Sequence, residues 1–145
     1  MKNKAIGVFD SGLGGLTAVK ELIKSLPNEN IVYFGDTGRV PYGTRSKETI
    51  IKYAAQDARF LLNHNVKMII AACGTVSSVA SSLGEELPVM FSGVLKPTAL
   101  ACAKATKTGS VAVLGTSATI NSHSYKNLLE KINPNLKVYE QDCPL

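Results

Sequence analysis

The side chains best suited to chemistry in this chain of 145 residues lie in four short segments, each directly after an apolar run. They include Asp10, Asp36, Cys73 and Thr116. Carboxylates, hydroxyls, a thiol and flexible glycines are groups that bind polar ligands and transfer protons. The four segments are 10–17, 35–43, 73–75 and 115–119. Their common placement after apolar runs predicts one shared polar site.

Cys73 is the strongest single candidate for chemistry. It follows the apolar run 66–71 and precedes a helix expected to begin near Thr75. A helix N-terminus lowers the pKa of a thiol, so we expect a thiolate near neutral pH. A buried, inert cysteine is the alternative at such a position. We interpret Cys102, which lies among alanines, as a core residue, and the surroundings of Cys143 stay open.

The glycine-rich segment 10–17 has a second interpretation. Gly12 and Gly14 after a strand, with Asp36 ending the next strand, are typical of a dinucleotide-binding turn. Thr17 stands where the third glycine of that turn is needed, and the chain has no Gly-Lys-Ser or Gly-Lys-Thr of a P-loop. Backbone N–H groups at the start of the following helix still allow a phosphate or carboxylate to bind.

Apolar runs alternate with longer segments of helical periodicity. The runs predict strands at 5–9, 31–35, 66–71, 88–91, 110–114 and 136–140. The periodic segments predict helices at 16–26, 46–63, 76–83, 97–105 and 119–132. This alternation is typical of an α/β fold with a mainly parallel sheet sandwiched by helices. Ligands bind such sheets at the carboxyl ends of the strands, where the four polar segments are expected to converge.

The segment 92–97 is the expected boundary between two lobes. We predict a first α/β lobe at 1–95 and a partial second lobe at 96–145. No helix follows the last predicted strand within the chain, so one face of that strand is expected to stay uncovered. An uncovered apolar face or edge favours self-association or pairing with a complementing C-terminal chain.

Composition excludes several classes of protein. A hydrophobic fraction of 45% with 19% charged residues is that of a globular chain, and no apolar run reaches the length of a membrane span. The net charge of +5 is scattered, which argues against nucleic-acid binding. Three cysteines without a CxxC pair, and His64 and His123 without partners at ligand spacing, predict no disulfide framework and no metal site. We expect a soluble, cytoplasmic protein.

Two segments together resemble one family. The sequences DSGLGGLT at 10–17 and GDTGRVPYG at 35–43 are similar to the first two signature segments of glutamate racemase, in the aspartate/glutamate racemase superfamily. The similarity continues through the rest of the chain in register. It includes 93–97, 115–120, Ser122, Tyr125 and 142–145.

The resemblance implies a cofactor-independent interconversion of L- and D-glutamate that supplies D-glutamate for peptidoglycan. In that family, one cysteine thiolate removes the α-proton, and a second thiol returns a proton from the opposite face. Cys73 matches the first cysteine, and Asp10 and Ser11 match the carboxylate and hydroxyl beside it. Asp10 is therefore expected to take part in catalysis and to contact the substrate. The other substrate-binding positions that the resemblance implies are Pro41, Tyr42, Gly43, Gly74, Thr75, Thr116 and Thr119.

The sequence departs from the family in two places. Gly74 stands where the family has Asn, and losing such a polar contact commonly costs about 1–3 kcal/mol. The second family cysteine belongs to a Gly-Cys-Thr-His segment that the resemblance places after Leu145, and neither Cys102 nor Cys143 has that context. Two hypotheses follow: a racemase-family chain that is weakly active or inactive alone, or an inert truncated or split-gene fragment that at most binds an acidic amino acid or a partner chain.

Overall fold

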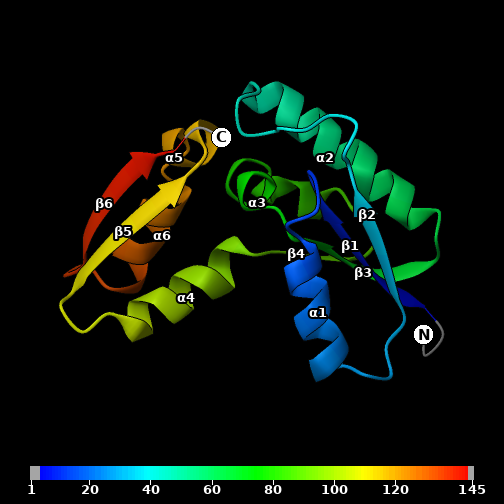
Figure 1. Ribbon diagram of the computed structural model, residues 1–145, viewed down its shortest axis with the longest axis horizontal. Helices are drawn as coiled ribbons and strands as arrows, with labels where there is room; N and C mark the ends of the chain where they lie inside the picture. The colour runs from blue at the N-terminus through cyan, green and yellow to red at the C-terminus, as the bar shows by residue number, and fades with distance from the viewer. Residues whose placement is uncertain (1–3, 144–145) are drawn as a thin grey trace.

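Two parallel sheets organise the chain in the computed structural model, which describes residues 4–143 (Figure 1). The larger sheet has four strands in the order β2-β1-β3-β4, and β5 pairs with β6 in the smaller one. The strands are β1 Ala5–Asp10, β2 Ile31–Gly35, β3 Val66–Ala71, β4 Met90–Gly93, β5 Ser110–Gly115 and β6 Lys137–Asp142. The predicted α/β class with parallel strands is confirmed. Pro144 and Leu145, from the last segment of the resemblance, lie outside the described residues.

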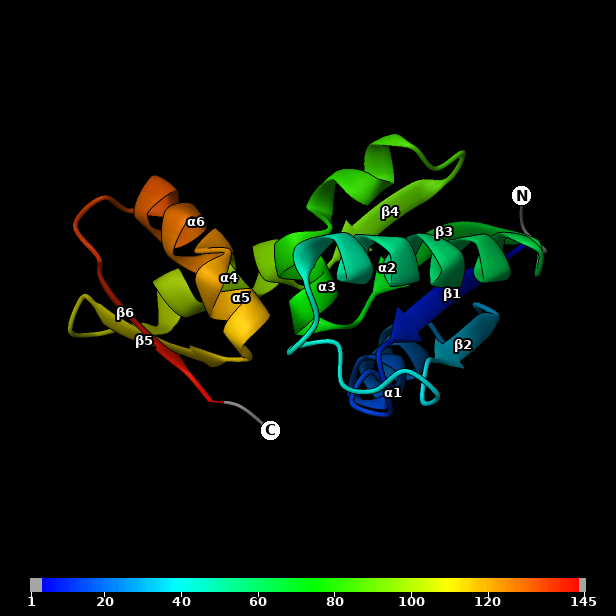
Figure 2. The same cartoon turned by 90° about the horizontal axis from the view of Figure 1, so that it is seen from above.

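The larger sheet holds the main core. Every residue of β1 is buried, and α2 (Lys47–Leu62) packs on the sheet through the apolar positions expected from its periodicity. Ser46 caps α2 by accepting a hydrogen bond from the Thr49 N–H. On the opposite side of the sheet lies α1 (Leu16–Ser25), which buries no residue (Figure 2). The two faces of this sheet are therefore covered unequally.

The smaller sheet has a core of its own. Helices α4 (Leu95–Ala105) and α6 (Ser124–Ile132) pack on one face of it around Ala99, Val111 and Leu129. Side chains on β5 and β6 alternate between this core and the outside, with Leu114 69% exposed and Tyr139 62% exposed. One face of this sheet is thus covered by helices and the other presents apolar side chains to solvent.

Three predicted elements show the largest differences from the structure, and several others differ by one or two residues at their ends. The helix predicted at 76–83 is α3 (Gly74–Val79) followed by the 3-10 helix η1 (Ser81–Glu85). The strand predicted at 88–91 begins later, as β4. The helix predicted at 119–132 is divided into α5 (Ser117–Asn121) and α6, so His123 does not lie within one continuous helix.

Local hydrogen bonds explain the division between α5 and α6. His123 has a φ of 50°, in the left-handed region, which interrupts the helix. The Ser122 hydroxyl donates to the Thr119 carbonyl, and the Ser124 hydroxyl donates to the Ser78 carbonyl at 2.6 Å. These bonds compete with continuous helical pairing and turn α6 toward the end of α3.

The predicted division of the chain at residues 95 and 96 stays a prediction. It falls at the start of α4, which follows β4 after a single residue. In the part of the chain that the structure describes, the helices are too short or too polar to cross a membrane.

Candidate functional site

A cavity of about 450 Å³ lies where the strands of the larger sheet end and the smaller sheet begins. It brings together most of the predicted site residues from segments far apart in the sequence. Those that line it are Asp10, Ser11, Cys73, Gly74, Thr75, Thr116 and Thr119. The segments that follow β1, β3 and β5 thus converge at one site, as expected from the parallel strands.

Asp10 closes the turn between β1 and α1. Its Oδ2 atom accepts hydrogen bonds from the N–H groups of Gly12 at 3.2 Å and Gly15 at 3.0 Å. The Tyr33 hydroxyl donates to the Gly12 carbonyl at 2.7 Å and holds the turn from β2. Because a carboxylate already occupies these N–H groups, the turn is unsuited to a phosphate, and the dinucleotide interpretation loses its support.

Cys73 lies at the junction of β3 and α3 and is 4% exposed. Its Sγ atom donates a hydrogen bond to the Ser11 Oγ atom at 3.5 Å. Burial raises the pKa of the Cys73 thiol, and the nearby Asp10 charge raises it further, while hydrogen bonds to Ser11 and Val76 act in the opposite direction. The expected lowering of this pKa is therefore wrong, because desolvation outweighs the short helix α3.

Hydroxyl groups link the two halves of the cavity. The Oγ1 atoms of Thr75 and Thr116 lie 2.9 Å apart, although they come from α3 and from the N-terminus of α5. Thr116 Oγ1 also lies 3.1 Å from Thr119 Oγ1 and accepts a hydrogen bond from the Thr119 N–H. These hydroxyls can both donate and accept, which suits them to a ligand that carries carboxylates and an ammonium group.

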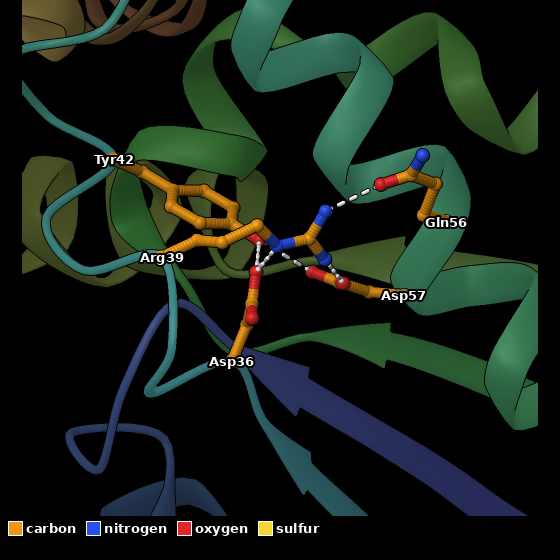
Figure 3. Close-up of polar contacts among 5 residues, drawn as sticks. All are labelled: Asp36, Arg39, Tyr42, Gln56 and Asp57. Carbon is orange, nitrogen blue, oxygen red and sulfur yellow. Dashed lines mark hydrogen bonds and ion pairs between the residues drawn. The ribbon is translucent and has the colours of Figure 1, made fainter.

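Pro41, Tyr42 and Gly43 lie outside the lining of this cavity. Tyr42 is buried, and its hydroxyl points toward Asp36 and Asp57 (Figure 3). The Gly43 carbonyl accepts a hydrogen bond from the Ala118 N–H at 3.1 Å, so this segment packs behind α5. Substrate contact by Pro41, Tyr42 and Gly43, implied by the resemblance, stays a prediction.

The structure adds cavity residues that the sequence patterns did not single out. Thr98 and Cys102 on α4 and Tyr125 on α6 contribute to the lining. Cys102 is half-buried and contacts the smaller core, so its interpretation as a pure core residue was incomplete. The predicted helices 97–105 and 119–132 contained these residues, but only the packing of α4 beside α6 shows which of their side chains face the cavity.

The remaining cysteine and histidines have other surroundings. Cys143 is exposed, and its N–H donates to the Gly115 carbonyl. His123 lies 2.6 Å from a Glu140 carboxylate oxygen, and His64 contacts the Phe60 carbonyl. Across residues 4–143, no three His, Cys, Asp or Glu side chains form a cluster that could hold a metal ion.

Comparison with known proteins gives a consistent result. A curated glutamate racemase from Geobacter metallireducens is 47% identical over 143 residues, which cover 98% of this chain and 53% of that protein. A curated glutamate racemase from Staphylococcus epidermidis is 46% identical over 98% of this chain and 54% of its own length. No protein-family model matches. The chain spans about half the length of the curated relatives it matches.

Solved structures of glutamate racemases superimpose on this chain over a similar share of their length. A glutamate racemase isoform from Bacillus anthracis superimposes with a TM-score of 0.95 at 40% identity, covering 99% of this chain and 55% of that one. The glutamate racemase of Francisella tularensis, solved with D-glutamate, superimposes with a TM-score of 0.91 at 45% identity over 100% of this chain and 55% of that one. Sequence and structure together identify the chain as a homologue of the glutamate racemases that matches about half of their length.

Proposed function

We propose that this chain binds glutamate in the cavity beside Cys73 and that the Cys73 thiol exchanges the α-proton on one face of the amino acid. The observation that carries the proposal is a buried thiol, 3.5 Å from the Ser11 hydroxyl, on the wall of a cavity that also contains the Asp10 carboxylate. The relative from Francisella tularensis, solved with D-glutamate, supports glutamate as the ligand.

The chemistry of the proposed step follows from the burial of Cys73. Its raised pKa makes the thiol the resting form, and the thiolate formed from it is poorly solvated and strongly basic. This thiolate takes the α-proton to form an S–H bond, and the electron pair of the broken C–H bond remains on the α-carbon, delocalised into the α-carboxylate. Return of a proton from the same thiol restores the starting enantiomer.

Net inversion needs a proton donor on the opposite face of the α-carbon. The resemblance assigns that donor to a Gly-Cys-Thr-His segment, which does not occur among these 145 residues. We therefore infer that further polypeptide provides it, either in a complementing chain or in sequence continuous with this one. Racemisation of glutamate in the cytoplasm, supplying D-glutamate for peptidoglycan, is the activity proposed for the complete site.

Binding without turnover is the second candidate function. Gly74 favours it, because a glycine replaces the side-chain amide that the family places in the cavity. Without this donor the developing carbanion loses one source of stabilisation. In this case the chain would bind an acidic amino acid and leave its α-proton in place.

Incubation with D- or L-glutamate in deuterated water distinguishes these functions. We expect one enantiomer to lose its α-proton signal in the NMR spectrum with retained configuration, because the Cys73 thiol exchanges with solvent before it returns deuterium. The exchange rate should keep rising with pH above the ordinary pKa of a cysteine thiol, since the pKa of this thiol is raised. Cys73→Ser should abolish exchange, whereas Cys102→Ser, which changes the other thiol of the cavity lining, should preserve it. Binding without exchange by the unsubstituted chain would support the second candidate.

A further inference from the structure

A buried polar cluster lies between α2 and the loop that follows β2 (Figure 3). We name the loop, residues 36–43, the tyrosine loop. Its Arg39 guanidinium pairs with Asp36 through Nε and with Asp57 of α2 through a terminal nitrogen at 2.8 Å. The Tyr42 hydroxyl contacts Oδ2 of both carboxylates, at 2.8 Å for Asp57. Asp57 is 1% exposed and projects from the middle of α2.

The cluster contains more acceptors than its protons satisfy when both carboxyls are ionised. The Tyr42 hydroxyl has one hydrogen but contacts a carboxylate oxygen on each side. Arg39 supplies one positive charge against two buried negative ones. A protonated Asp57 resolves both mismatches, because it can donate to the Tyr42 oxygen while Tyr42 donates to Asp36.

The titratable groups around Asp57 agree with this arrangement. Burial raises its pKa to about 6, the Asp36 charge raises it as well, and the contacts with Tyr42 and Arg39 lower it. Tyr53, one turn before Asp57 on α2, stacks beneath the Arg39 guanidinium at 4.3 Å and packs against the Tyr42 ring. The guanidinium is thus held by the two carboxyl groups and by the Tyr53 ring.

The far end of the tyrosine loop touches the wall of the cavity. The Gly43 carbonyl accepts the Ala118 N–H, and a methyl group on Gly43 would overlap with the Thr116 side chain. Thr116 in turn contacts Thr75, next to Cys73. A continuous set of contacts therefore runs from Asp57 through Tyr42 and Gly43 to α5.

We propose that Asp57 is a positioning residue of the cavity: through Tyr42 and Arg39 it fixes the tyrosine loop against Thr116 and so sets the distance between α5 and Cys73. The hydrogen bonds of Asp57 go to Arg39 and Tyr42, which do not line the cavity, so its effect is transmitted by the loop. The part of this proposal that concerns glutamate binding rests on the proposed function.

The test compares two tyrosines whose rings pack against each other at a tilt. Tyr42→Phe removes the hydroxyl that joins the two carboxyls, and Tyr53→Phe removes the hydroxyl of a neighbouring ring outside that link. In two-dimensional NMR spectra of the free chain, we expect Tyr42→Phe and Asp57→Asn to shift the amide signals of Ala118 and Thr119, and Tyr53→Phe to leave them in place. Unchanged signals in folded Tyr42→Phe protein would overturn the proposal.

A pH titration separates positioning from a general loss of stability. In the unsubstituted chain, the amide signals of Gly43 and Ala118 should titrate with a midpoint near 6, and in Asp57→Asn they should be flat between pH 5 and 7. A flat response in the unsubstituted chain contradicts the proposal and needs no variant to fold. With D-glutamate as the probe, Asp57→Ala, which removes the contacts with both Tyr42 and Arg39, should weaken binding about tenfold. If the unsubstituted chain binds no glutamate, the proposed function fails, while the titration still tests the role of Asp57.

Discussion

Two helices flank the larger sheet and have opposite environments. Helix α2 buries Ile50, Ala54, Ala58 and Leu61 against the sheet. Helix α1 carries an apolar stripe of similar spacing, yet it buries no residue, and Ile23 is 56% exposed. The apolar stripe therefore shows where a helix forms but not how completely the helix is covered.

The different burial of α1 and α2 bears on the candidate site. The α2 face combines the main core with the buried cluster that holds the tyrosine loop, so it supports the cavity. The α1 face, like the outer face of the β5–β6 sheet, presents apolar side chains to solvent. Exposed apolar faces favour association, so these two faces are where the expected self-association or pairing with a complementing chain can be tested.

A matched pair of isoleucines tests this difference most strongly. Ile50→Ala on α2 should lower the free energy of unfolding by about 2–5 kcal/mol, because it opens a cavity in a closed core. Ile23→Ala on α1 should change it by less than about 0.5 kcal/mol, because that side chain is already exposed. Urea unfolding measures both values. Equal losses of unfolding free energy in the two variants would show that α1 and α2 are equally packed and would contradict the difference between them.

The buried carboxyl on the α2 face predicts a pH dependence of stability. The pKa of Asp57 is about 6 in the folded chain and about 4 in an unfolded one, so the folded state binds the proton more tightly. The contribution of Asp57 is therefore most favourable below pH 4 and declines as the pH rises through 6, by about 2–3 kcal/mol. Urea unfolding between pH 4 and 7 should show Asp57→Asn gaining stability relative to the unsubstituted chain by that amount. Parallel curves would contradict the raised pKa.

Two glycines test the contact between the α2 side and α5. Gly43→Ala should cost about 1–3 kcal/mol, because its methyl group overlaps with Thr116. Gly74→Ala should gain up to about 1 kcal/mol, because nothing lies within 4 Å of the added methyl group and Gly74 is helical. Thermal unfolding measures whether Gly43→Ala lowers the stability and whether Gly74→Ala raises it. A neutral Gly43→Ala would show that the tyrosine loop does not press on Thr116.

The smallest expected effect concerns the exposed stripe itself. Ile23→Ser should leave stability within about 0.5 kcal/mol and reduce any concentration-dependent association of the chain. Sedimentation velocity at several protein concentrations measures this association. Lys24→Ser, which replaces a polar residue on the same helix, is the control. Association that is the same in both variants would exclude α1 as the contact surface.

Much of the fold could be predicted because most of the strands are short apolar runs followed by polar residues. The bounds of β2 and β3 match the prediction, and the Ser46 cap marks the start of α2. The division between α5 and α6 could not be predicted, because it depends on a Ser124 hydroxyl that reaches the Ser78 carbonyl on α3. The different burial of α1 and α2 could not be predicted either, because periodicity carries no information on what packs against an apolar stripe.

The candidate site was predicted in part. The segments after β1, β3 and β5 converge as parallel strands require, and they bring Asp10, Cys73 and Thr116 to one cavity. The direction of the Cys73 pKa was predicted wrongly, because burial is a property of the packed structure. The partnership of Tyr42 with Asp57 joins a loop to a helix, and nothing in the local sequence indicates it.

Titration with D-glutamate followed by NMR tests the central claim most directly, that the cavity between the two sheets is a glutamate site. The amide signals of Ser11 and Thr75 on one side and Thr119 on the other should shift together, with one dissociation constant. A nucleotide added in parallel should leave them unchanged, because Asp10 occupies the N–H groups of the glycine turn. Shifts confined to one side of the cavity, or none at saturating glutamate, would contradict the account.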